Sequence, residues 1–152
     1  MNAVDRIRRD HRTVRGHLRD LRRLHREDVE RRAEAFYGLK RELEILARVE
    51  EALFYPAVQG ADGPASEWVR DALQVHDEVE RVLAEMAAFE VDEPAFDRAL
   101  DNLEAMVEQH LEEEEEVLLP RARSRMDRER LLSLGEEMES LRRVLGLRLG
   151  AR

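Results

Sequence analysis

Apolar residues recur every three or four positions along nearly the whole chain, and the pattern breaks only near turn-forming residues. This is the period of an α-helix with one buried face, and no segment shows the alternation of a β-strand. The fold class is therefore predicted to be all-α. Five helices are expected, at about residues 2–27, 29–58, 66–89, 92–120 and 126–148.

The breaks between these helices define the expected architecture. Residues 59–64 are predicted to form a loop with Ser66 as the next N-cap, Pro56 to kink or end the second helix, and the fourth helix to end near Pro120. Short connections favour an antiparallel up-down-up-down four-helix bundle over residues 1–120. Residues 121–152 would then add a C-terminal helix, packed on the bundle or used in a homodimer.

The 152 residues include no cysteine and have the size of one domain. Disulfides, thiolate metal sites, iron-sulfur clusters and a cysteine nucleophile are excluded. No run is apolar enough for a membrane span. The N-terminus reaches Arg6, Arg8 and Arg9 without the apolar stretch that a signal peptide needs. We therefore expect a cytoplasmic protein with no membrane partner.

The net charge of −9 argues against nucleic acid as a partner, because contacts to phosphates need a basic face. The charge is uneven, since residues 1–26 hold nine arginines and three aspartates. We interpret this segment as a basic helix lying beside acidic ones.

Polar residues interrupt the apolar faces of four helices, where a charged side chain costs several kcal/mol unless it is paired or bound to a cation. Residue counts from the turns place these residues in one layer, and two of them stand four positions apart on one helix face. Such a set of imidazoles and carboxylates suits Fe, Mn or Zn, and the carboxylates could bridge two ions. The predicted metal ligands are His11, Glu50, His76, His110 and Glu114.

The surrounding motifs identify a family. The Glu-x-x-His motif of ferritin-like proteins and the His-Glu-x-x-His motif of zinc peptidases are both absent. The chain instead resembles the hemerythrin and HHE cation-binding family over about residues 5–120. The resemblance rests on His11, His76, the stretch from His110 to Glu114, and a Glu-Glu-x-x-x-x-Pro sequence that starts at Glu50 and again at Glu114.

One position departs from the family pattern, because Leu46 stands where the second helix would carry a histidine. The resemblance implies that the first two helices hold one iron and the next two the other, with the two glutamates bridging. The ion at His11 has then lost a ligand. The nearest replacements are Glu42 or a water, and Glu80 stands where circulating hemerythrins have a further histidine, either as an extra ligand or as an exposed residue.

Other candidates for the vacant position are predicted to point elsewhere. His17 and His25 lie too far around or along the first helix, and Tyr37 and Tyr55 are each nine residues from Leu46, on the opposite side of an α-helix.

The resemblance implies a hemerythrin-like protein with one or two irons that binds or responds to O2, NO or peroxide. Two alternatives use the same bundle: a metal-free interaction module, and a peroxide- or iron-oxidising di-iron enzyme. Phosphotransfer through an exposed histidine is disfavoured, because His76 and His110 lie on apolar faces.

Overall fold

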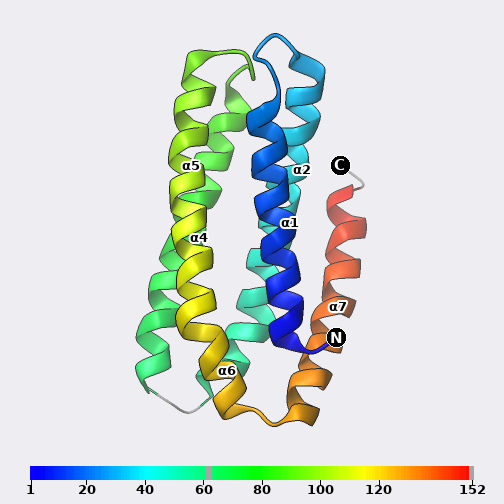
Figure 1. Cartoon of the computed structure of the whole chain (residues 1–152), viewed down its shortest axis with the longest axis vertical. Helices are drawn as coiled ribbons and strands as arrows, with labels where there is room; N and C mark the ends of the chain where they lie inside the picture. The colour runs from blue at the N-terminus through cyan, green and yellow to red at the C-terminus, as the bar shows by residue number, and fades with distance from the viewer. Residues whose placement is uncertain (61–62, 151–152) are drawn as a thin grey trace.

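The computed structural model describes residues 1–60 and 63–150, and within these ranges it is helical with no strand. The helices form an elongated bundle in which α1, α2, α4 and α5 run side by side (Figure 1). The all-α prediction is confirmed. The elements are α1 (Ala3–Arg23), α2 (Val29–Val49), the π-helical turn η1 (Glu50–Phe54), α3 (Tyr55–Gln59), α4 (Gly63–Ala88), α5 (Pro94–Glu113), the π-helical turn η2 (Glu114–Leu118), α6 (Leu119–Arg125) and α7 (Arg128–Gly150).

Two helix ends differ from those predicted. The fourth helical segment passes through Pro120 and ends at Arg125, and the third begins at Gly63, so that Ser66 lies inside the helix instead of capping it. Pro120 is the second residue of α6, directly after the π-helical turn η2, and a proline is tolerated where an α-helical hydrogen-bond pattern has just begun. Of the predicted loop, Gly60 forms a turn with φ of 50°, and residues 61 and 62 lie outside the described part of the chain.

The apolar faces of the second and fourth segments shift by one residue after their π-helical turns. The backbone N–H of Tyr55 bonds to the carbonyl of Glu50, five residues earlier, and that of Leu119 bonds to Glu114 in the same way. Each turn thus accommodates one residue more than an α-helix would. A constant helical period, continued from the preceding apolar residues, predicts that Leu53, Ala57 and Val117 are buried, but the buried residues are Phe54, Val58 and Leu118.

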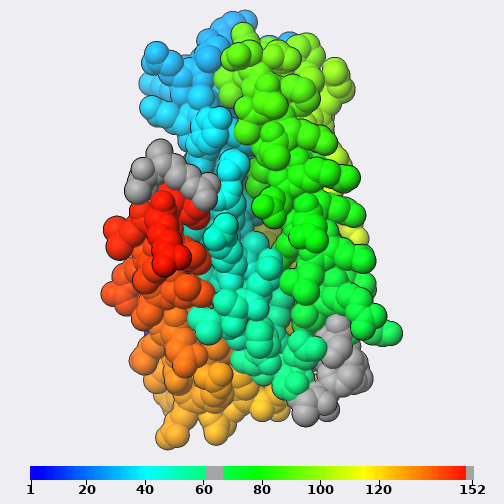
Figure 2. All heavy atoms as spheres, turned by 180° about the vertical axis from the view of Figure 1, so that it is seen from behind, coloured from blue at the N-terminus to red at the C-terminus, as the bar shows by residue number. Residues whose placement is uncertain are grey.

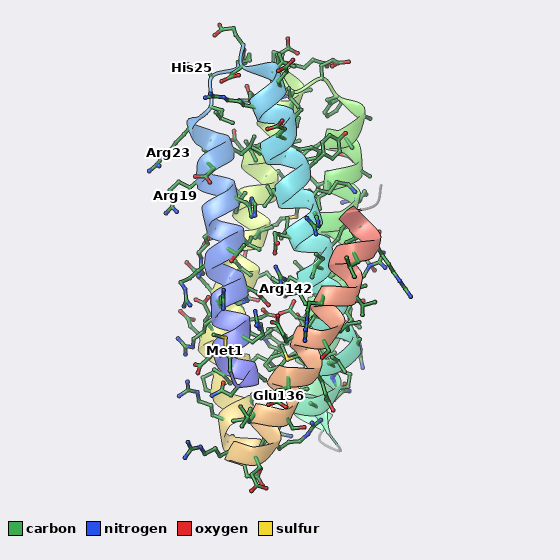
Figure 3. The ribbon with its side chains drawn as sticks, turned by 90° about the vertical axis from the view of Figure 1, so that its right-hand side faces the viewer. Met1, Arg19, Arg23, His25, Glu136 and Arg142 are labelled. Carbon is green, nitrogen blue, oxygen red and sulfur yellow. The ribbon has the colours of Figure 1, made fainter. Side chains whose placement is uncertain are left out.

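The basic N-terminal helix lies beside an acidic one, as expected. Arg22 of α1 bonds Asp101 and Glu104 of α5, while Arg19 and Arg23 point away from the bundle (Figure 3). None of the helices described is long and apolar enough to cross a membrane.

The C-terminal helix α7 lies against α1 and α2, and the rear view shows it beside α2 (Figure 2). Charged groups link these helices, since Arg142 of α7 contacts Glu42 of α2 and Asp10 of α1. Figure 3 shows Met1 next to the same helix. The chain passes so close to Gly135 that a Cβ there would lie 2.2 Å from the Met1 carbonyl oxygen.

Gly135→Ala is expected to destabilise the protein by about 1–3 kcal/mol, because backbone atoms of residues 1–3 would have to move away from the new methyl group. Urea denaturation measures the loss. Gly16→Ala is the matched control, since its Cβ would meet only a side-chain atom at 3.7 Å, and removing a helical glycine stabilises by up to about 1 kcal/mol. Equal effects of the two substitutions would contradict close packing at Gly135.

Candidate metal centre

The structure brings the five predicted ligands together from both halves of the bundle. Their donor atoms form two groups, and within each group the atoms lie within 4.8 Å of one another. One group consists of Glu50, His76 and His110, and the other of His11, Glu50 and Glu114. Glu50 belongs to both groups, and every member of the second is buried.

The two buried carboxylates are electrostatically unequal. Burial and the adjacent Glu114 carboxylate raise the pKa of Glu50 well above that of an ordinary glutamate. Burial works against Glu114 too, but hydrogen bonds from Glu50, His11 and His110 hold its pKa well below the usual range. Without a cation, the pair therefore keeps a proton on Glu50.

One oxygen of this pair has no hydrogen-bond partner among the residues that the structure describes. This oxygen is Oε2 of Glu50. The residue is only 1% exposed, so water does not replace the missing partner. A buried acceptor without a partner costs about 1–3 kcal/mol. A cation bound to the Glu50 carboxylate would offset this cost, and the donor atoms that meet at Glu50 suit a metal ion of the class that prefers nitrogen and carboxylate ligands.

A second layer of carboxylates orients two of the histidines. Nδ1 of His76 lies 2.7 Å from Glu51, and Nδ1 of His11 lies 2.6 Å from Glu115. Arg15 also bonds Glu115, at 2.8 Å. Histidines that ligate metals are commonly held in this way, with Nδ1–H donating to a carboxylate and Nε2 left for the ion. In both cases Nε2 points into the cluster, at 3.3 Å from Glu50 for His76 and 2.8 Å from Glu114 for His11.

Tyr55 lies in the cluster, so the prediction that it points to the opposite side of the helix is wrong. Its hydroxyl donates to Glu114 at 2.5 Å and lies 3.2 Å from Nε2 of His76 and 3.3 Å from Nε2 of His110. The prediction assumed nine residues of continuous α-helix after Leu46. The π-helical turn η1 intervenes and rotates Tyr55 onto the face of Glu50.

The two halves of the site repeat one local design. In each half a π-helical turn begins at a buried glutamate, the next glutamate holds a histidine of another helix, and a proline follows six residues after the first glutamate. In this repeat Leu46 of α2 corresponds to His110 of α5, four residues before the buried glutamate, and Tyr55 corresponds to Leu119. Glu51, Glu115 and the π-helical turns were not predicted. The sequence feature that marks all of them is the repeated Glu-Glu-x-x-x-x-Pro motif.

Glu42 and Glu80, the carboxylates considered as further ligands, belong to neither group of donor atoms. Glu42 pairs with Arg142 of α7, and Glu80 is exposed at the rim of a cavity. Leu46 is 3% exposed and lines that cavity together with Glu50. No side chain described in residues 1–60 and 63–150 takes the place of an imidazole at position 46 in the two ligand groups.

Comparison with known proteins identifies relatives of this fold. The family model "Hemerythrin HHE cation binding domain" matches residues 2–122. A crystal structure of a hemerythrin HHE cation-binding domain-containing protein from Mycobacterium kansasii is similar, with a TM-score of 0.85 and 24% identity over 99% of this chain and 89% of that one. No curated protein matches the chain.

Proposed function

The chain belongs to the hemerythrin HHE cation-binding domain family, and we propose that it binds iron, as one or two ions, and interacts through it with O2, NO or peroxide. The ligands in this proposal are His11, Glu50, His76, His110 and Glu114. The observation that carries it is that Glu50, a buried carboxyl whose Oε2 atom finds no partner among the described residues, belongs to both groups of converging donor atoms. Manganese and zinc suit the same donors.

Bound iron would supply a redox-active cation with an open coordination position, which is what a small oxygen or nitrogen ligand requires. The chain's own residues determine where that position lies. The group of Glu50, His76 and His110 lines a cavity, whereas the group of His11, Glu50 and Glu114 is fully buried. The small molecule is therefore expected to reach the ion at Glu50, His76 and His110 through this cavity.

The central test is metal analysis of protein expressed in iron-supplemented medium, followed by titration with a chelator. We expect iron to be bound with unequal affinities, the ion near His76 and His110 more tightly, because the ion near His11 lacks an imidazole at residue 46. Release of two equal ions in one step would contradict this assignment. A protein that takes up no Fe, Mn or Zn would instead support a metal-free interaction module.

Tyr55 is proposed as an additional oxygen donor to the ion near His76. Trp68 packs edge-on against its ring, with centroids 5.8 Å apart, and helps fix its position. Ferric protein is expected to show a visible charge-transfer band from the tyrosine oxygen, and Tyr55→Phe to lose it while retaining iron. Tyr37→Phe is the control, since Tyr37 is 54% exposed on the same helical segment. A band that survives in Tyr55→Phe would exclude this role.

A further inference from the structure

A cavity of about 360 Å³ opens between α2, α4 and α5 and ends at the first ligand group. Its inner end is formed by Glu50, His76 and His110. The buried part of the lining also contains five apolar side chains, those of Leu43, Leu46, Leu83, Val107 and Leu111.

The cavity is too large for a diatomic ligand alone. A water molecule occupies about 30 Å³ and a ligand pocket about 300–1,000 Å³, which puts this cavity in the range of small organic molecules. Its polar donors are concentrated at the inner end, so a fitting molecule carries one polar head and an apolar body.

In the metal-free protein, the charges around the cavity favour a neutral molecule over an anion. The rim carries the carboxylates of Glu44, Glu51 and Glu80 and the cations Lys40 and Arg48. Lys40 is paired with Glu44. At the inner end, a carboxylate ligand would lie against the protonated Glu50, with the ionised carboxylate of Glu114 directly behind it, and like charges in a buried site repel strongly.

We propose that this cavity binds an organic hydroperoxide, with its O–O head at Glu50, His76 and His110 and its hydrocarbon body against Leu46, Leu83 and Val107. This inference rests on the proposed function, because the choice of a peroxide depends on the iron proposed at that end of the cavity. It extends that function by assigning the substrate's apolar part to residues of this chain.

Binding can be tested without turnover by using 2-phenyl-2-propanol, the unreactive alcohol that corresponds to cumene hydroperoxide. Calorimetric titration of metal-free and zinc-loaded protein is expected to show one bound alcohol per chain in both forms. A carboxylate of the same shape, 2-methyl-2-phenylpropanoate, is expected to bind the metal-free protein about tenfold more weakly, equivalent to about 1.4 kcal/mol. Equal or tighter binding of the carboxylate would overturn the choice of a neutral molecule.

Ala84→Phe tests the location, because Ala84 is exposed and lines the cavity. The added ring is expected to weaken alcohol binding about tenfold, or about 1.4 kcal/mol. Ala88→Phe is the matched control, since Ala88 is exposed on the same helix one turn further along and outside the lining. A folded Ala84→Phe protein that binds the alcohol as the parent does would overturn the proposal.

Metal uptake is measured separately on the same samples, so the two hypotheses fail in different ways. Alcohol binding by a chain that takes up no metal would support the cavity as a binding site for a neutral molecule, but would count against the proposed iron function and the choice of a peroxide. Metal binding without alcohol binding would overturn the cavity proposal and leave the iron function standing.

Discussion

Glu50→Gln is expected to abolish binding of both metal ions and, at the same time, to stabilise the metal-free protein by on the order of 1–3 kcal/mol. Glu50 is shared by both ligand groups, so its loss removes a charged donor from each. In the metal-free protein the same carboxyl is buried beside Glu114 with one oxygen unpaired. A neutral amide of the same shape can donate to Glu114 as the protonated carboxyl does, without the cost of keeping a proton that the unfolded chain releases.

The stability of the metal-free protein should also depend on pH through this residue. Burial and Glu114 raise the pKa of Glu50, so above the ordinary pKa of glutamate the folded protein keeps a proton that the unfolded chain releases. Stability through Glu50 is therefore full below that ordinary value and falls as pH rises from it toward the raised pKa. Glu50→Gln is expected to remove this fall.

Urea denaturation across a pH series, with and without iron, measures both effects. Glu80→Gln provides the control, because this exposed glutamate on α4 borders the cavity but belongs to neither ligand group. If Glu50→Gln retained two ions, or destabilised the metal-free protein, the shared role of Glu50 would be wrong.

The sequence predicted the bundle and the ligand cluster because both depend on helical periodicity. His11, Glu50, His76, His110 and Glu114 interrupt apolar faces, and counting residues from the turns placed them in one layer. The distances agree with that expectation, since their donor atoms meet in two overlapping groups. The resemblance to the family added the pairing of the helices and drew attention to Leu46.

The main errors in the predicted buried faces lie in or directly after the two π-helical turns. A period of 3.6 residues assigns Leu53 and Val117 to the core, but the wider turns bring in Phe54 and Leu118. The same shift carries Tyr55 into the cluster. A prediction from periodicity assumes 3.6 residues in every turn, so it does not locate a turn that holds one residue more. The contacts of Glu51 and Glu115 depend in addition on side-chain directions across helices.

Leu46→His is expected to give the second ligand group the imidazole that the other group has in His110. Leu46 lies one helical turn before Glu50, as His110 lies one helical turn before Glu114. Without metal, the buried polar ring should destabilise the protein by about 1–3 kcal/mol. Iron should reverse this loss, since a ligand at 100 times its dissociation constant stabilises by about 2.7 kcal/mol. The iron-loaded variant should also gain the near-ultraviolet absorption of a di-iron centre.

Leu43→His separates metal binding from the general effect of a buried histidine. Leu43 is 7% exposed and lines the same cavity, but it lies nearly one further turn from Glu50 and outside both ligand groups. This variant should show the loss of stability without the iron-dependent recovery. If Leu46→His were destabilised and bound no more iron than the parent, residue 46 would not point at the metal. The weaker ion would then owe its lower affinity to another cause, because an imidazole on this face of α2 could not restore it.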